Sequence, residues 1–470
     1  MSTHPSPRNS SLFAVSCRAL LGAVIGFALL PVSALAQEQR IVIYADKDLG
    51  PSRLRHGFVH GVTYVKGRDY SRTVQLIAAL KPRSWRLANH NNNVYGFVVG
   101  EAGLPQKLGT EIVVTIQDVF NQRFGYDVKV SPNCPPRKGN CFASYEAFRK
   151  AWLAVVNGAM KTIAEKNLVV NYLDVFGEPT TGETKLSGLT PEQFGDIFKA
   201  THDTVRQYRP NAKIVAPSVA GFGERLLKRF LNFVAENNIR LDALSWHEFE
   251  TPEVVPAHVE EMREVFRAQP RLCNPTCPEI HINEYAPQEQ YLIPGYGVGW
   301  LYYLEKARVD HANRACWGLN NRETTCWDGF EGMLLQDNVT PRPVYWAYKA
   351  YADMSDGRRL ASEASMPRTV AIASKDESKR ELRILAGRFG QKGASGRVAI
   401  EVRELRYGIT SLVAEITRIP GTGASERGMA VAPAATREVL QVQNDAFSIV
   451  IPNFQDGDAY SIVLRPDGAR

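Results

Sequence analysis

The sequence predicts an α/β protein in which a (β/α)8 TIM barrel is followed by an accessory antiparallel β-sandwich. Across residues 55–355, short strand-like runs alternate with segments whose apolar residues keep helical spacing, as repeated βα units require. Across residues 356–470, short β-rich runs broken by glycine, aspartate and proline replace this pattern. A doubly wound open sheet is the alternative to the barrel, but no glycine-rich phosphate loop follows the first predicted strand.

Eight strand-like runs can be placed in the barrel region, most of them followed by an amphipathic segment. The clearest helix starts are at Ser144 and at Thr190, where Thr190 and Gln193 form a capping box and Pro191 occupies the first turn. Eight such units over about 300 residues indicate a closed barrel. The predicted strands cover residues 56–63, 84–87, 111–116, 169–176, 213–217, 241–246, 279–283 and 314–319.

A further strand-like run precedes the barrel, within residues 37–54. We expect this run, Arg40–Ala45, to pair into the sandwich and so to tie both ends of the chain together. The strands predicted in the C-terminal region itself cover residues 368–374, 380–386, 396–403 and 447–450.

The N-terminus has the pattern of a secretory signal peptide over residues 1–36. Basic residues precede an apolar run at residues 19–30, and Ala34-Leu35-Ala36 fits a small-residue cleavage site. We expect the mature chain to begin near Gln37, to be secreted or periplasmic, and to have no membrane segment after cleavage. An uncleaved membrane anchor is the alternative.

Six of the seven cysteines remain once Cys17 is removed with the leader, and they form three close pairs in sequence. Six cysteines allow 15 pairings, but short loops cost the least entropy to close. The pairs lie in three separate loops, whereas zinc needs four converging ligands, so we expect disulfides and neither a metal nor another cofactor. The expected bonds are Cys134–Cys141, Cys273–Cys277 and Cys316–Cys326.

The formal net charge of +7 is spread along the chain. A nucleic-acid-binding protein would concentrate its basic residues in one stripe, so we expect no nucleic-acid partner. The oligomeric state is not indicated by any sequence pattern.

Two glutamates follow strand-like runs about three βα units apart, in Asp174-Val175-Phe176-Gly177-Glu178-Pro179 and in His281-Ile282-Asn283-Glu284-Tyr285. Catalytic groups of a barrel come from the C-terminal ends of its strands. Most single glutamates are solvated loop residues, but two at such strand ends match the needs of glycoside hydrolysis. One carboxyl protonates the leaving oxygen, and the other attacks the sugar or activates water, so a carbohydrate is the expected substrate.

These motifs resemble the clan of retaining barrel glycosidases whose acid/base follows strand four and whose nucleophile ends strand seven. In that clan the fourth-strand motif is usually Asn-Glu-Pro, where this chain has Gly177-Glu178-Pro179. The chain is most similar in texture to glycoside hydrolase family 39, the β-xylosidase and α-L-iduronidase group. The resemblance implies that Glu178 is the acid/base and Glu284 the nucleophile.

The resemblance also implies a set of residues around the sugar. Arg86 would lie beneath the nucleophile, His247 would contact it, and Trp317 would stack on the sugar. Tyr285 lies beside the nucleophile in sequence, and the polar cluster at Asn89 after the second strand has amides that match vicinal hydroxyls. The expected substrate-binding residues are Arg86, Asn89, His247, Tyr285 and Trp317.

The two carboxyl groups must differ in protonation to play these parts. Glu284 must stay ionised, helped by hydrogen bonds from Arg86 and His247. Glu178 must carry a proton, so we expect its pKa to be raised by burial and by the charge of Glu284.

Gly177 departs from the family pattern, because the usual asparagine hydrogen-bonds the sugar 2-hydroxyl and glycine cannot. Asn89 or Asn283 could replace that contact, the substrate could differ at C2, or the activity could be weak. A non-catalytic carbohydrate-binding relative is therefore one alternative, and an inverting or furanoside-cleaving glycosidase is another.

Peptide mapping of the oxidised protein should recover the three local disulfides, and N-terminal sequencing after export should begin at Gln37. The even cysteine count and the short spacings are the reason for expecting local disulfides, and the cleavage motif at Ala34-Leu35-Ala36 is the reason for expecting a start near Gln37. A long-range disulfide, or six free thiols, would contradict the assignment.

Overall fold

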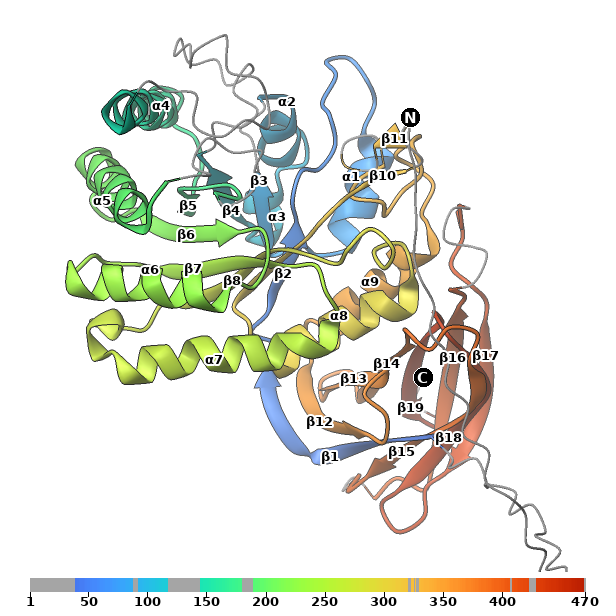
Figure 1. Cartoon of the computed structure of the whole chain (residues 1–470). Helices are drawn as coiled ribbons and strands as arrows, with labels where there is room; N and C mark the ends of the chain where they lie inside the picture. The colour runs from blue at the N-terminus through green and yellow to red at the C-terminus, as the bar shows by residue number, and fades with distance from the viewer. Residues whose placement is uncertain are drawn as a thin grey trace, which may run out of the picture. The chain divides into compact units, whose positions relative to one another are not determined.

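A closed barrel of eight parallel strands forms the first part of the fold in the computed structural model. The structure describes residues 39–87, 92–116, 144–179, 189–319, 323–324, 326, 329–405, 408–421 and 428–468. Within them β2 pairs with both β3 and β9, which closes the barrel and confirms the predicted fold class (Figure 1). The barrel strands are β2 (Arg55–Phe58), β3 (Ser84–Leu87), β4 (Glu111–Thr115), β5 (Tyr172–Asp174), β6 (Lys213–Val219), β7 (Ala243–Glu248), β8 (Glu279–Tyr285) and β9 (His311–Arg314).

The eighth barrel strand lies earlier than the sequence predicted. The prediction of residues 314–319 followed an apolar run, but the paired strand is His311–Arg314, whose histidine and asparagine are buried. Gly318–Leu319 instead forms β10, which pairs with β11 (Glu323–Thr324) in a separate ribbon. The prediction failed because the inner surface of this strand is polar, so hydrophobicity does not mark it.

Helices cover the outer surface of the barrel strands, and α4, α5, α6 and α7 lie side by side there (Figure 1). The predicted starts are present, since Ser144 caps α4 and Thr190 with Gln193 forms a capping box on α5. The longer helices are α1 (Ser71–Ala79), α4 (Tyr145–Glu165), α5 (Pro191–Tyr208), α6 (Glu224–Glu236), α7 (Val255–Ala268), α8 (Pro294–Lys306) and α9 (Pro343–Asp353). The short helical segments are α2 (Asn92–Tyr95), η1 (Gly96–Glu101), α3 (Leu104–Leu108), η2 (Pro252–Val254) and η3 (Pro270–Cys273).

Nine strands, counted within the described residues, form the second sheet in the order β17-β16-β19-β14-β13-β12-β1-β15-β18. Strand β1 lies inside it, antiparallel to β12 and parallel to β15, so the sheet is mostly antiparallel and combines segments from both ends of the chain. Buried apolar side chains of these strands form one hydrophobic cluster. Its strands are β1 (Gln39–Pro51), β12 (Arg358–Ala364), β13 (Thr369–Asp376), β14 (Glu381–Arg388), β15 (Ser395–Arg403), β16 (Ser411–Ile419), β17 (Ala435–Gln441), β18 (Phe447–Gln455) and β19 (Ala459–Pro466).

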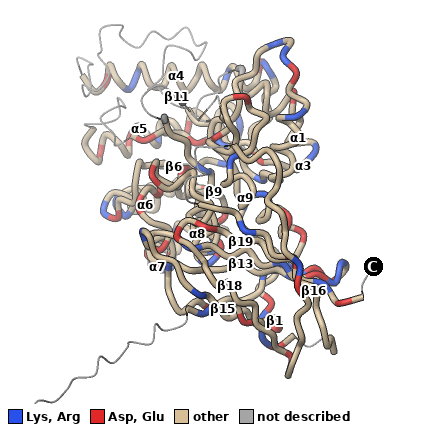
Figure 2. Tube along the Cα trace, turned by 90° about the vertical axis from the view of Figure 1, so that its right-hand side faces the viewer, with Lys and Arg blue, Asp and Glu red and all other residues tan. Residues whose placement is uncertain are grey.

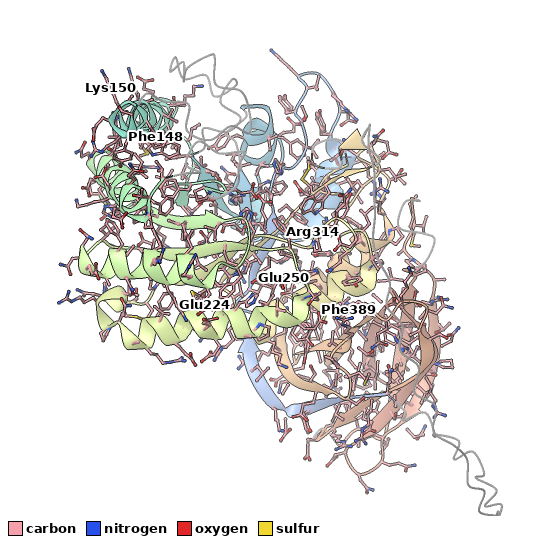
Figure 3. The ribbon with its side chains drawn as sticks, in the orientation of Figure 1. Phe148, Lys150, Glu224, Glu250, Arg314 and Phe389 are labelled. Atoms are coloured by element: carbon pink, nitrogen blue, oxygen red, sulfur yellow. A yellow bond between two sulfur atoms is a disulfide. The ribbon has the colours of Figure 1, made fainter. Side chains whose placement is uncertain are left out.

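Helix α8 packs closely against this sheet because glycines line its contact face. The Gly295 amide donates to the Gly457 carbonyl at 2.7 Å. A Cβ at Gly295 would lie 2.1 Å from the Arg388 carbonyl oxygen, and one at Gly299 would lie 2.5 Å from the ring of Phe389 (Figure 3). The missing side chains therefore set the distance between helix and sheet.

Charged residues of both signs are interspersed along the trace in Figure 2. None of the helices in the described part of the chain combines the length and the apolar character needed to cross a membrane.

Replacing Gly295 by alanine should lower the free energy of unfolding by about 3 kcal/mol, because the new methyl group would meet backbone atoms that cannot move aside. Urea denaturation measures the change. Gly100→Ala is the matched control, since its Cβ would meet nothing within 4 Å, and we expect it to change stability by less than about 0.5 kcal/mol. Equal effects of the two substitutions would contradict the close-packing argument.

Candidate active site

The two predicted glutamates meet at the C-terminal end of the barrel. Glu178 follows β5, and Glu284 lies near the end of β8. One carboxylate oxygen of each, together with a ring nitrogen of His247, lie within 4.8 Å of one another. The fold therefore brings together two carboxyl groups that the sequence only placed at the ends of separate strands.

Glu284 is held by a buried ion pair beneath it. Arg86 Nη1 donates to Glu284 Oε1 at 2.7 Å, and Arg86 Nε donates to Asp174 Oδ2 at 2.8 Å. Arg86 and Asp174 are both fully buried, whereas the Glu284 side chain is 19% exposed. Arg86 thus orients the carboxylate as predicted, but its burial contradicts the expectation that it binds substrate directly.

Asp174 is the centre of the hydrogen bonds below the site. It also accepts from Ser218 Oγ at 2.5 Å and from Asn283 Nδ2 at 3.0 Å. Because a buried charge is costly unless its hydrogen-bonding capacity is satisfied, these donors are what make an ionised Asp174 tolerable beside Arg86. Sequence reasoning did not single out Asp174, although it ends the strand that leads to Glu178.

Asn283 is engaged beneath the site, which removes it from the alternatives considered for the missing family asparagine. Its side chain is buried, and its amide also donates to Ser218 Oγ at 2.7 Å. The cause is a β-bulge in β8, where Trp246 of β7 faces Ile282 but His247 faces Glu284. Asn283 is the extra residue, and the bulge aims both Asn283 and Glu284 into the barrel.

Tyr285 does not line the site, so its predicted role in substrate binding is also wrong. Its side chain is buried among the helices outside the barrel, with its hydroxyl 3.0 Å from that of Tyr348 and its ring 5.6 Å from Trp300. Successive residues of a strand point to opposite faces, so the residue after an inward-pointing Glu284 points outward.

His247 lies between the two glutamates. It is closer to Glu178, whereas the sequence predicted that it contacts Glu284. Its Nδ1 is 3.2 Å from Glu178 Oε1 and 4.0 Å from Glu284 Oε2. Its Nε2 is buried and has no hydrogen-bond partner among the described residues. The imidazole therefore acts mainly on Glu178, and only weakly on Glu284.

The pKa of Glu178 is lowered, contrary to the prediction that it is raised. Burial alone would raise this pKa, but the hydrogen bond and charge of His247 and the charge of Arg86 outweigh burial and bring it below its ordinary value. The sequence argument considered burial and Glu284 and left out the histidine that the fold places against this carboxyl.

The backbone fixes the position of Glu178. Its φ of +48° is in the left-handed region, and its amide donates to the Ser218 carbonyl at 3.1 Å. Two residues earlier, Phe176 packs against Trp152 and Phe194, with ring centroids 5.7 and 5.2 Å away. A strained residue held between a hydrogen bond and an aromatic cluster is typical of functional sites.

Aromatic side chains extend from His247 to the rim. Phe249 lies edge-on to His247 at 5.5 Å and to Trp317 at 5.2 Å. Trp317 is partly exposed, and its indole donates to the Ala286 carbonyl at 2.9 Å. An aromatic face suits the apolar face of a sugar, so this position agrees with the predicted role of Trp317, which remains a proposal. Phe249 was missed, although it directly follows the sixth-strand motif.

His60 and Glu331 were also missed. The amides of His60 and Gly61 donate to Glu331 Oε1 at 2.6 and 2.7 Å, and burial raises the pKa of Glu331 well above its usual range. Burial lowers the pKa of His60 to about 4, although the charge of Glu284 opposes this shift. The place of His60 just after the first barrel strand could have indicated it, but no sequence signal marks Glu331.

A buried arginine anchors the segment that carries Glu331. Arg314, labelled in Figure 3, donates to the backbone carbonyls of Glu331 and Tyr291. Its side chain is fully buried at the end of β9. The eighth strand therefore fixes the loop that supports the site from this side.

Two of the predicted disulfides are confirmed, Cys273–Cys277 and Cys316–Cys326. The second one secures the segment after β9 that contains Trp317, and Cys316 Sγ lies 3.4 Å from His60 Nδ1. Cys134, Cys141, Asn89 and the predicted leader lie outside the described residues.

Three groups of side chains in the described part of the chain bring possible metal ligands within 4.8 Å of one another. Glu178, His247 and Glu284 form one, but their contacts with each other and with Arg86 already account for them. A second joins His60 to Cys316 and Cys326, whose sulfur atoms are in a disulfide and so are not thiolates. The third group is Glu279, His281 and His311, and it lies near the N-terminal ends of β8 and β9.

A closed eight-stranded barrel with paired glutamates beyond its fourth and seventh strands, joined to a β-sandwich, is an architecture of glycoside hydrolases. No protein-family model matches the chain, and no curated protein matches its sequence. Solved structures of glycoside hydrolases do share the fold, which confirms the predicted likeness to this clan and to family 39 at the level of architecture.

Three solved structures illustrate the likeness in fold. N2152 from Neocallimastix frontalis is 18% identical, with a TM-score of 0.71, covering 91% of this chain and 100% of that one. A monomeric β-xylosidase from Caulobacter crescentus CB15 is 13% identical, with a TM-score of 0.61, covering 92% and 100%. The GH39 enzyme from Xanthomonas axonopodis pv. citri is 14% identical, with a TM-score of 0.56, covering 93% and 100%. At these identities the likeness establishes the fold and leaves the substrate open.

Replacing His247 by glutamine should raise the pKa of Glu178 and change the pH dependence of stability. A carboxyl whose folded pKa is lowered stabilises the fold above its unfolded pKa of about 4.3, and this stabilisation is lost as the pH falls through the folded value. The wild type should therefore have a higher Tm than His247→Gln near neutral pH, by a margin that narrows below about pH 4.3. In a Glu178→Gln background the pH-dependent part of the margin should vanish. A margin that stays constant with pH would contradict the coupling.

Proposed function

We propose that the chain is an exported glycoside hydrolase that cleaves glycosidic bonds of an oligo- or polysaccharide with retention of anomeric configuration. The observation that carries the proposal is that one oxygen of Glu178 and one oxygen of Glu284 lie less than 4.8 Å apart at the mouth of the barrel. Retaining enzymes hold their carboxyl groups about 5–5.5 Å apart, whereas inverting enzymes leave about 6.5–9.5 Å for a water molecule. The spacing therefore favours double displacement over inversion.

The surroundings of the two carboxyl groups assign their roles. Glu284 accepts a charge-assisted hydrogen bond from the buried Arg86, which fixes the direction of its carboxylate. The side chain of Glu178 is 33% exposed, against 19% for Glu284. The contact of Glu178 with His247 affects how readily its carboxyl group holds a proton. We therefore assign Glu284 as the nucleophile and Glu178 as the acid/base.

In the first step Glu284 attacks the anomeric carbon as the bond to the leaving oxygen breaks, and the proton of Glu178 passes to that oxygen. In the second step Glu178 takes a proton from water, which attacks the anomeric carbon and releases Glu284. The low pKa of Glu178 in the free protein suits the second step directly. For the first step it means that the protonated form prevails only at acidic pH, so activity should be greatest there.

Two other functions are favoured by particular observations. Gly177 offers no side chain to the sugar 2-hydroxyl, and Asn283 is engaged elsewhere, which would suit a carbohydrate-binding relative without activity. A GH51 arabinofuranosidase from Xanthomonas axonopodis pv. citri shares the fold at a TM-score of 0.59 and 13% identity, which keeps a furanoside substrate in view.

Alanine substitutions of the two glutamates, assayed on a panel of aryl glycosides that includes furanosides, test the proposal. Glu284→Ala should abolish turnover of every substrate. Glu178→Ala should lower the rate by roughly 10²–10⁴-fold on poor leaving groups and spare the first step on good ones. Azide should then rescue Glu178→Ala with retained configuration and Glu284→Ala with inverted configuration.

Glu250→Ala is the matched control, because Glu250 is exposed just beyond β7 (Figure 3) and makes no part of the proposed machinery. Its activity should equal that of the wild type. An opposite azide pattern would exchange the two roles. A wild type that binds glycans but turns over none of the panel would favour the binding protein.

A further inference from the structure

A second cluster of ionisable side chains lies at the N-terminal end of the barrel, remote from the candidate active site. It joins Glu279 and His281 of β8 to His311 of β9. Glu279 and Glu284 are five residues apart on one strand, a distance of about 16 Å at the usual rise. Any function of this cluster is therefore independent of the glycosidase proposal.

Ligand-type atoms converge in this cluster. Glu279 Oε2 lies 3.0 Å from His281 Nε2 and 3.6 Å from His311 Nε2. Glu111 Oε2 of β4 lies 3.1 Å from His311 Nε2 on another side and does not belong to this group of three. Two ligands of a tetrahedral zinc ion with bonds of about 2.0–2.1 Å are about 3.3 Å apart, so the separations of Glu279 Oε2 from the two imidazoles fit the edges of such a tetrahedron.

The barrel itself fixes the two imidazoles. His281 and His311 face each other in the register of β8 and β9, and their rings stack at 4.1 Å with an interplanar angle of 28°. His311 Nδ1 lies 3.2 Å from Ser84 Oγ, and the Tyr172 hydroxyl donates to Glu279 Oε2 at 2.8 Å. The Ser84 contact is on the ring nitrogen of His311 that faces away from the cluster, and hydrogen bonds of this kind orient histidine ligands in metal sites.

His311 Nε2 lies among groups that make opposite demands on it. Arg55 Nη1, a donor, lies 3.4 Å away, while the carboxylate oxygens of Glu111 and Glu279 are acceptors. A ring nitrogen either donates or accepts, so no single tautomer suits all three. Glu111 Oε2, although buried and paired with Arg55 Nε at 3.1 Å, makes no hydrogen bond in the described part of the chain.

The charges nearby select the kind of ion. Arg55 and Lys213 face the cluster, with Lys213 Nζ 3.0 Å from the Tyr172 hydroxyl, and they balance the two carboxylates. A hard cation such as Ca²⁺ or Mg²⁺ depends on carboxylate charge and oxygen ligands, which are too few here. Imidazole nitrogens favour Zn²⁺ and its neighbours in the first transition series.

We propose that Glu279, His281 and His311 bind one divalent transition-metal ion of the Zn²⁺ type. The ion cross-links β8 and β9 at the N-terminal face of the barrel. Residues at this face serve stability, whereas those at the opposite face serve chemistry. Sequence analysis predicted no metal, because these ligands come from two separate strands and share no known spacing motif.

The test uses the exported, disulfide-bonded protein after treatment with EDTA and dialysis, in non-reducing buffer. Calorimetric titration with ZnCl₂ should give one ion per chain, together with a rise in Tm that EDTA reverses. Substitution with Co²⁺ should give the visible absorption bands of a four-coordinate nitrogen and oxygen site. A wild type that takes up no Zn²⁺ at 100-fold excess over protein, roughly millimolar ion, would overturn the proposal.

Variants locate the ion. His311→Gln and Glu279→Gln should each weaken Zn²⁺ binding at least 100-fold, and Glu279→Gln keeps the size of the side chain and its contact with Tyr172 if the histidine variant fails to fold. His202→Gln, on α5, is the matched control and should bind as the wild type does. The double variant Glu178→Gln/Glu284→Gln should also retain the ion. Loss of binding in that double variant, with binding retained in Glu279→Gln, would place the ion in the candidate active site and overturn the assignment.

Discussion

The buried ion pair between Arg86 and Asp174 is the interaction on which the candidate active site depends. Asp174 accepts from a guanidinium, a hydroxyl and an amide that come from three different strands. Burying two charges is tolerable only when such partners satisfy them, so loss of Arg86 would leave the charge of Asp174 uncompensated, and loss of the hydroxyl or the amide would remove a hydrogen bond from it. The same guanidinium also reaches Glu284, which links the packing of the barrel to the direction of a carboxylate at its mouth.

Irregularities in β6 and β8 bring the side chains of the site together above this ion pair. The bulge in β8 lets Asn283 complete the network while Glu284 rises above it. A register shift in β6 lies at Ser218, whose hydroxyl serves Asp174 and whose carbonyl holds the amide of Glu178. Regular strands would alternate these side chains between the two faces, so the departures from regularity are what collect them in one place.

The two ends of the barrel use polar side chains in different ways. At the C-terminal end, the carboxylates of Glu178 and Glu284 remain partly open to solvent, as chemistry on a substrate requires, while His247 beside them is buried. At the N-terminal end, stacked histidines and paired charges close the interior between the strands. Helix α8 connects this barrel to a sheet that contains β1, so the chain crosses from sheet to barrel and back again.

The sequence by itself determined the barrel, the strand-end positions of Glu178 and Glu284, the capped helix starts and two local disulfides, because these depend on periodicity and short-range spacing. The tertiary structure alone decided that Tyr285 points outward, that Asn283 is consumed beneath the site, and that His247 lowers the pKa of Glu178. It also placed the eighth strand in a polar segment and joined Glu279 to His311. A bulge, a cross-barrel ion pair and the electrostatics of neighbouring strands arise from long-range contacts, and local sequence patterns carry no record of which residues will meet.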